Sequence, residues 1–211
     1  MDPQSRPKIV GLGGSLARIS RSRSALLRAV EGAAGAGADT QLLDLRRLDL
    51  PLYNPDEPDL TDAASVLVES CHGCDGLLWS TPLYQGTVSG SFKNALDWLH
   101  VLGSRDPPYL NDKVIGLISA AGGTQGLQAI NTMEFSVRAL RGWAVPYVVP
   151  VASAARVVDQ EGRIIDAGVE AQLDRLGAEV VRVAERFAAD LTLHRQQECA
   201  DAAERVAAAG V

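Results

Sequence analysis

The sequence predicts an α/β fold in which a parallel sheet of five strands lies between two layers of helices. Short runs of apolar and β-branched residues alternate along the chain with stretches of helical periodicity, which is the pattern of successive βαβ units. The strand runs also lack the polar–apolar alternation of half-exposed strands, so we expect both faces of the sheet to be covered. A length of 211 residues suits one domain, which we place at residues 1–193.

The first half of the chain supplies three of the predicted strands. The run at 8–14 is predicted to be a buried strand, and the apolar residues of 22–35 recur at helical spacing, which predicts a helix. Residues 40–45 form the second strand. An irregular proline-rich loop follows, and then a helix at 61–73 and the third strand at 76–80.

The second half of the chain continues this alternation. A helix is predicted at 90–102, a strand at 113–120, a longer helix at 126–143 and the fifth strand at 145–151. Helices between strands imply right-handed crossovers. Five strands connected in this way fit the doubly wound order 2-1-3-4-5 of a flavodoxin-like three-layer sandwich.

The pattern changes after the fifth strand. Residues 156–166 are predicted to form a small hairpin around Glu161 and Gly162. A long helix follows, with one apolar face made of Val169, Leu173, Leu176, Val180, Val183 and Phe187. The tail at 194–211 is rich in Ala, Glu and Arg, and we expect it to be a frayed helix or a packing arm.

The formal net charge of −6 argues against general binding to nucleic acid or to anionic membranes. No apolar run reaches the roughly 18 residues that a membrane span needs. The N-terminal stretch MDPQSRPK is polar and lacks the apolar region of a secretion signal. We therefore expect a cytoplasmic protein.

Two of the three cysteines, Cys71 and Cys74, form a C-x-x-C motif with His72 between them. A redox or metal site is one interpretation, but a zinc site needs further ligands, and the other histidines lie far along the chain. The pair also lies at the end of a predicted helix and not after a strand, where a thioredoxin-like motif would be. We favour two small buried thiols.

Ligands of open parallel sheets bind beyond the carboxyl ends of the strands, where the loops 13–24, 81–90 and 119–126 are predicted to meet. The first loop, GGSLARISRSRS, is neither a dinucleotide fingerprint nor a P-loop. Its hydroxyls and the unpaired N–H groups of a helix start favour a phosphate site at Ser15, Ser20 and Ser22. Arg18 or Arg21 could add a charge-assisted contact. The alternative is ordinary N-capping by Ser20 or Ser22, with the arginines in solvent.

The second loop begins at Pro82, which has no N–H to donate and is expected to end its strand. Leu83 and Tyr84 then lie in the crevice, where an apolar group and an aromatic ring suit a flat heteroaromatic ligand. The alternative is a plain strand-to-helix loop in which Tyr84 is merely half buried.

The third loop, SAAGGTQG, carries Gly122 and Gly123, which allow close approach to a ligand or a positive φ. Thr124 is a candidate cap for the next helix. The alternative is a glycine-rich turn without a ligand.

The sequence lacks a convincing catalytic constellation. Three scattered histidines form no Ser-His-Asp or Cys-His arrangement, and no His, Asp or Glu cluster has metal-binding spacing. We therefore predict no catalytic side chain and no metal site. This pattern favours a protein whose bound cofactor carries out the chemistry.

Three ordered segments resemble the NADPH-dependent FMN reductase family, flavodoxin-like NAD(P)H:flavin and quinone reductases. GGSLARISRSRSALL resembles the family's phosphate loop, TPLYQGTVSGSFKNALDW its P-x-Y and K-N-x-x-D-W segment, and SAAGGTQGLQA its S-x-G-G-x-x-G loop. The match spans about residues 8–151. It departs from the family pattern at Ala17, where an arginine is common and Arg18 comes one place later, at Gln85, where many members have asparagine, and at Phe92, which replaces leucine.

The resemblance implies an FMN site, with its phosphate at Ser15, Ser20 and Ser22 and with Arg18 nearby. It implies contacts to the isoalloxazine and ribityl groups from the second loop (Pro82, Leu83, Tyr84, Gln85) and to the ring edge from the third (Ala121, Gly122, Gly123). The helix residues Lys93, Asn94, Asp97 and Trp98 match the K-N-x-x-D-W pattern, which we interpret as packing or subunit contact.

The resemblance also implies an enzyme that uses FMN with NADPH or NADH. Hydride would pass from the nicotinamide to the flavin, and the reduced flavin would serve a flavin-dependent monooxygenase, a quinone, an azo dye or chromate. The alternatives are a flavodoxin-type electron carrier and a non-catalytic FMN-binding module. A homodimer or homotetramer is implied by resemblance alone.

Overall fold

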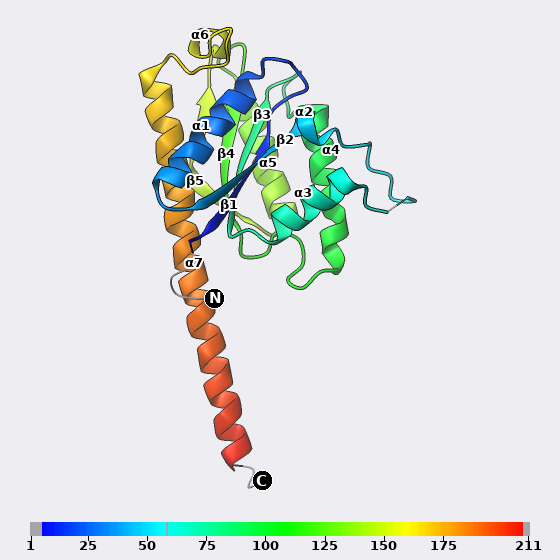
Figure 1. Ribbon diagram of the computed structural model, residues 1–211, viewed down its shortest axis with the longest axis vertical. Coiled ribbons are helices and arrows are strands. Elements are labelled where there is room, and N and C mark those ends of the chain that lie inside the picture. The colour runs from blue at the N-terminus through cyan, green and yellow to red at the C-terminus, as the bar shows by residue number, and fades with distance from the viewer. Residues whose placement is uncertain (1–5, 58, 209–211) are drawn as a thin grey trace.

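The structure, a computed structural model, describes residues 6–57 and 59–208, with backbone alone over 191–208. Five parallel strands form one sheet: β1 (Lys8–Gly13), β2 (Asp39–Asp44), β3 (Gly76–Pro82), β4 (Val114–Ala120) and β5 (Trp143–Val151). Their order is β2-β1-β3-β4-β5, which confirms the predicted topology (Figure 1). The edge strand β5 contains two prolines, Pro146 and Pro150.

Helices cover both faces of the sheet, which confirms the three-layer prediction. One face carries α1 (Arg21–Gly35) and α7 (Ala167–Ala208), and the other carries α3 (Asp62–His72), α4 (Gly90–Trp98) and α5 (Leu127–Ala139) (Figure 1). Each face has its own apolar core.

Helices α1 and α7 pack closely through two glycines. A Cβ at Gly32 would lie 2.6 Å from Cα of Asp174, and one at Gly177 would lie 2.2 Å from the carbonyl oxygen of Ala29. Because each clash is with backbone, the two helices could not keep this spacing with a side chain at either position.

Hydroxyl side chains cap the N-termini of three of these helices. Ser20 accepts the N–H of Arg23 at the start of α1, and Thr61 accepts that of Ala64 at the start of α3. Ser89 caps α4 in the same way. Each cap satisfies an N–H group that has no partner inside its helix.

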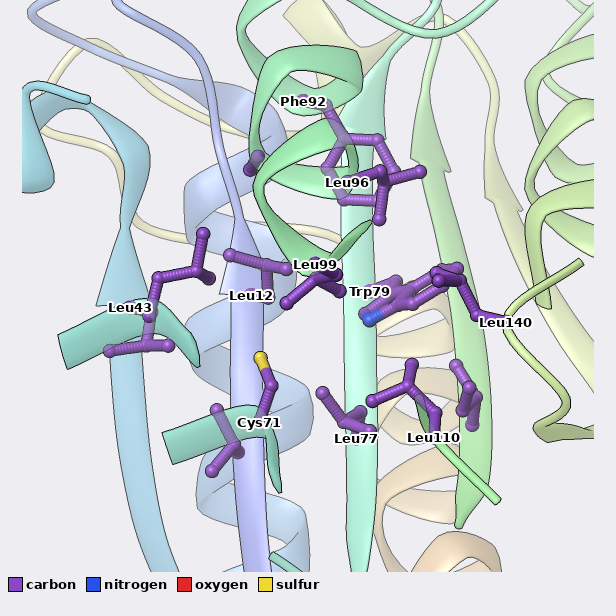
Figure 2. Close-up of a cluster of buried hydrophobic side chains, with 14 of the residues drawn as sticks. Leu12, Leu43, Cys71, Leu77, Trp79, Phe92, Leu96, Leu99, Leu110 and Leu140 are labelled. Atoms are coloured by element: carbon purple, nitrogen blue, oxygen red, sulfur yellow. The ribbon is translucent and has the colours of Figure 1, made fainter. Parts of the chain in front are cut away.

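The core between the sheet and α3–α5 contains the cysteine motif. Cys71 lies among Leu12 and Leu77, and Trp79 packs edge-on against Phe92 with ring centroids 5.7 Å apart (Figure 2). Burial raises the pKa of Cys71 well above its usual value and raises that of Cys74 to about 12. Both thiols are therefore protonated and inert, which supports the interpretation of the motif as two buried thiols.

The structure corrects several predicted boundaries. Leu45, predicted as the end of a strand, begins the short helix α2 (Leu45–Leu48), and the helix predicted at 90–102 becomes the 3-10 helix η1 (Leu99–Ser104) after Trp98. Trp143, predicted at the end of a helix, is the first residue of β5. Arg141 has a φ of 63°, and this left-handed residue ends the helical path before the strand begins.

The chain after β5 forms a short helix, α6 (Ala154–Val157), and a bridge between Val158 and Ile164 that closes the predicted hairpin. The next helix, α7, is continuous to Ala208, so its second half projects beyond the body of the molecule, at the end opposite α6 (Figure 1). The last residues of the predicted tail, 209–211, lie outside the described residues. No helix in the described part of the chain is both long and apolar enough to cross a membrane.

Candidate functional site

Three strand ends bring the three predicted loops to one edge of the sheet. In the parallel register Gly13 lies opposite Ser80, and Pro82 lies opposite Ala120. The N–H of Gly14 donates to the Ser80 carbonyl at 3.0 Å, and the N–H of Leu83 donates to the Ala120 carbonyl at 2.9 Å. The loops after β1, β3 and β4 therefore start from fixed, adjacent points.

The first loop gathers its three predicted serines into one hydrogen-bonded cluster. Ser15 Oγ donates to Ser20 Oγ at 2.9 Å, and the hydroxyls of Ser20 and Ser22 are 3.1 Å apart. All three side chains are buried, although serine is usually found at the surface. The cluster lies at the start of α1, whose first N–H groups have no intrahelical partner.

Ser20 is also the N-cap of α1, so the capping interpretation holds for this serine. Capping and phosphate binding are compatible here, because Ser15 and Ser22 add hydroxyls that a simple cap does not require. The arrangement combines three hydroxyl groups with free backbone donors, which is the donor set that a phosphate needs.

The arginines of the first loop differ in their surroundings. Arg18 and Arg21 are exposed, and neither forms an ion pair within the described residues. Arg23 donates from Nε to Asp44 Oδ2 at 2.7 Å. Asp44 is buried at the end of β2, so this bond joins the start of α1 to the neighbouring strand.

The second loop folds into a tight turn. Tyr84 and Thr87 exchange two backbone hydrogen bonds of 3.0 and 3.1 Å, and the central residues Gln85 and Gly86 have φ angles of 49° and 83°. Two positive φ angles define a type I′ turn. Pro82 is the last residue of β3, as predicted, and Leu83 is half-buried. The turn leaves Tyr84 52% exposed.

The third loop is held by the segment that follows β5. Ala121 donates its N–H to the Val151 carbonyl and accepts from Ala154, and the Gly123 carbonyl accepts from Ser153. A Cβ at Gly122 would meet nothing within 4 Å, so this backbone faces open space.

The prediction that Thr124 caps the next helix is wrong. The N-cap of α5 is Gly126, and no side-chain hydrogen bond caps this helix. The positive φ considered for Gly122 and Gly123 is also absent, since neither is among the left-handed glycines of the described chain. The Gly126 carbonyl instead accepts the hydroxyl of Ser119 at 2.8 Å, and this bond fixes the turn from inside the sheet.

Buried hydroxyls at the strand ends position the loops, and sequence reasoning missed them. Ser80 Oγ donates to the Ser22 carbonyl at 2.8 Å, which ties β3 to the first turn of α1. Thr81 Oγ1 accepts the N–H of Ser89 at 3.0 Å and so holds the far end of the second loop. A polar residue at the end of an otherwise apolar strand was the available signal for Ser80, Thr81 and Ser119.

The helix with the K-N-x-x-D-W pattern has a packing role inside the chain. Asn94 Nδ2 and Trp98 Nε1 both donate to the Pro51 carbonyl, at 2.9 and 2.8 Å. Lys93 and Asp97 form an ion pair one helical turn apart. A subunit contact through this helix stays a prediction.

The site carries donor groups suited to an organic phosphate and none suited to a metal. In the described part of the chain, no group of three or more His, Cys, Asp or Glu side chains could hold a metal ion. Buried hydroxyls and helix N–H groups fit a phosphate, while a half-exposed tyrosine and an open glycine backbone fit a flat ring. The fold defines a flavodoxin-like α/β protein, and the three loops that meet at its sheet edge form the candidate cofactor site.

Comparison with known proteins agrees with this class. Residues 7–156 match the family described as NADPH-dependent FMN reductase, and the chain belongs to that family. The resemblance drawn from the three sequence motifs is thereby confirmed.

Individual relatives have related names. The chain is 30% identical over 158 residues to the NADPH-dependent FMN reductase ArsH of Acidithiobacillus ferrooxidans, covering 75% of this chain and 65% of that protein. It is 31% identical to the NADPH azoreductase of Bacillus sp. (strain OY1-2), covering 66% of this chain and 73% of that protein. The chain thus spans slightly less than two thirds of the ArsH length.

Solved structures agree in fold. The flavoenzyme FerB of Paracoccus denitrificans, an NAD(P)H:(acceptor) oxidoreductase, superposes with a TM-score of 0.68 at 20% identity. The match covers 86% of this chain and 98% of FerB. At this identity the similarity establishes a common fold.

Proposed function

We propose that the protein is an NAD(P)H-dependent FMN reductase that transfers reducing equivalents from a nicotinamide, through bound flavin, to a second acceptor. The observation that carries the proposal is the meeting of the buried serine cluster, the Tyr84 turn and the open Gly122 backbone at one edge of the sheet. Membership of the FMN reductase family supports it.

Different loops would contact different parts of the flavin. The phosphate would lie on the hydroxyls of Ser15, Ser20 and Ser22 and on the N–H groups at the start of α1, with Arg18 able to contribute charge. The ring system would lie between the second and third loops, on Pro82, Leu83, Tyr84 and Gln85 on one side and Ala121, Gly122 and Gly123 on the other.

A bound flavin supplies the redox chemistry, since it accepts hydride from a reduced nicotinamide and releases electrons to another molecule. The side chains bind and orient two substrates, so catalysis comes from proximity.

We infer that the second acceptor is a small molecule. One relative is named an NADPH azoreductase and another a probable NADPH:quinone oxidoreductase, which supports an aromatic acceptor. The exposed side chains of Leu16, Tyr84 and Leu127 come from or border the three site loops and would favour an apolar ring over an oxyanion. Delivery of free reduced flavin to a monooxygenase is the alternative.

Steady-state oxidation of NADPH and NADH with added FMN tests the proposal. Turnover should depend on FMN, and purified protein saturated with FMN should quench flavin fluorescence. Assays with a quinone, an azo dye and chromate then rank the acceptors. Absence of turnover with both nicotinamides, in protein that binds FMN, would favour an electron carrier instead.

A further inference from the structure

A second cleft lies beside the serine cluster, on its β2 side. It has a volume of about 440 Å³ and lies between the start of α1, the helix α2 and the tip of the hairpin at 158–164. Its lining residues are Ala17, Arg18, Ile19, Ser20, Arg23, Ser24, Asp44, Arg46, Arg47, Glu161 and Gly162. The cleft borders the flavin site, because Arg18 and Ser20 are also assigned to the flavin phosphate above. The residues contributed by α2 and the hairpin have no part in the flavin contacts proposed above or in the family resemblance.

The cleft is basic in a protein that is acidic overall. Four arginines line it against two carboxylates, Asp44 and Glu161, while the whole chain carries a net charge of −6. Such a local excess of positive charge attracts anions.

The carboxylates of the cleft are already engaged. Asp44 accepts from Arg23 Nε at 2.7 Å and from the Arg46 backbone N–H at 3.1 Å. Glu161 lies 3.4 Å from Arg163, which is outside the lining. The guanidinium groups of Arg18 and Arg46 form no ion pair within the described chain, and that of Arg47 reaches Asp44 only at 3.9 Å.

We propose that this cleft binds the 2′-phosphate on the adenosine half of NADPH, and that Arg46 and Arg47 set a preference for NADPH over NADH. The proposal rests on the proposed function, since it assumes that a reduced nicotinamide is the electron donor. Arg46 and Arg47 stand on α2, and they belong to none of the three loops assigned to the flavin.

Two kinds of phosphate could occupy the cleft, and they differ in charge. A 2′-phosphate is a monoester that carries close to two negative charges at neutral pH, as a phosphorylated serine does. A phosphate inside a dinucleotide linkage, such as that of the adenylate half of FAD, has one ester bond and one anhydride bond and carries one charge. Arg46 has no ion pair in the described chain and Arg47 only a long one to Asp44, so the two guanidinium groups match the more highly charged monoester better, and guanidinium forks bind phosphate oxygens in pairs.

The test compares Arg46→Ala/Arg47→Ala with Arg138→Ala. Arg138 is an exposed arginine without an ion pair in the described chain, and it lies on α5 away from the cleft, so it is a matched control. The double variant should raise the KM for NADPH by at least about tenfold, the order expected from losing charge-assisted contacts to one phosphate. The KM for NADH and the Kd for FMN should stay within about twofold, and the control should change none of the three.

A direct binding measurement keeps the test independent of turnover. Titration of the purified protein with NADP⁺ and with NAD⁺, which differ only in the 2′-phosphate, should show tighter binding of NADP⁺, and only this preference should disappear in the double variant. If the wild-type protein binds NADP⁺ in this way but oxidises neither reduced nicotinamide, the proposed function fails while the cleft assignment stands.

Three results would overturn the assignment. Equal losses for NAD⁺ and NADP⁺ would assign the cleft to the phosphates of the dinucleotide linkage, which FAD also has. A parallel rise in the KM values for NADPH and NADH would remove its role in discrimination. A weakened Kd for FMN in the double variant would make the cleft part of the flavin site.

Discussion

Asn94 Oδ1 accepts the backbone N–H of Tyr53 at 2.9 Å, although 41 positions separate the two residues. The same amide donates to the Pro51 carbonyl, and the Tyr53 ring packs edge-on against Trp98 with centroids 5.3 Å apart. Helix α4, which carries Asn94 and Trp98, therefore holds the start of the proline-rich loop between α2 and α3.

Replacing Asn94 should release this loop. Asn94→Ala removes two hydrogen bonds and is expected to lower the free energy of unfolding by about 2 kcal/mol. Urea unfolding followed by tryptophan fluorescence measures the loss. Asn94→Asp keeps the acceptor and should lose less, and equal losses in both variants would contradict the paired hydrogen-bond account.

The serine cluster makes different predictions for flavin affinity and for stability. Ser15→Ala should weaken FMN binding by roughly tenfold, since a donor to a charged phosphate is lost, and should cost about 1 kcal/mol of stability, because the buried bond to Ser20 is lost as well. Ser20→Ala should weaken binding too and cost more stability, about 2 kcal/mol, because Ser20 bonds to Ser15 and also caps α1. Fluorescence quenching of FMN and urea unfolding give the two numbers. Unchanged affinity in Ser15→Ala would remove this serine from the phosphate site.

The buried hydrogen bond between Ser80 and the Ser22 carbonyl should contribute both to stability and to FMN affinity. Ser80→Ala removes one buried hydrogen bond, at a cost of about 1 kcal/mol, while the Ser22 carbonyl keeps its partner inside α1. It should also weaken FMN binding, because the first turn of α1 loses its attachment to β3. Ser136→Ala, which removes a hydroxyl bond within α5, is the control and should leave FMN affinity unchanged.

The sequence predicted the strand order because apolar strands and periodic helices leave few topologies for a chain of this length. It placed Ser15, Ser20 and Ser22 together because one short loop carries all three next to a predicted helix start. It gave only a weak signal for Ser80, since a polar residue at a strand end stands out in the sequence but does not reveal whether its hydroxyl is bonded. It placed Trp143 in a helix because apolar residues give the same sequence pattern at the end of a helix and at the start of an edge strand. In the structure the left-handed φ of Arg141 ends the helical path before Trp143.

The Tyr84 turn carries strain that one substitution should relieve. Gln85 has a φ of 49°, and left-handed backbone costs a residue with a Cβ roughly 1–2 kcal/mol. Asparagine tolerates this region better, so Gln85→Asn should raise stability by about 0.5 kcal/mol. Thermal unfolding measures it. Gln85→Val, with a branched Cβ, should shift the midpoint in the opposite direction.

The buried thiols predict a dependence of stability on alkaline pH. Burial raises the pKa of Cys71 and raises that of Cys74 to about 12, whereas an unfolded thiol titrates near 8.5. The folded state thus keeps protons that the unfolded state releases, so the free energy of unfolding should fall as pH rises above about 9. Below that pH the contribution is fully present.

Urea unfolding at pH 7.5, 9 and 10 checks this slope, with Cys71→Ala/Cys74→Ala as the comparison. The double variant should lose less stability between pH 7.5 and 10 than the wild type does. Identical slopes would mean that other groups carry the alkaline dependence.

The two prolines of β5 have a consequence for how copies of the chain can meet. A proline offers no N–H, so an extended segment laid along this outer strand would find gaps in its ladder of donors at Pro146 and Pro150. Continuation of the sheet from one molecule into the next is therefore disfavoured at this border. A contact between copies at this border would therefore depend on side chains and not on backbone pairing.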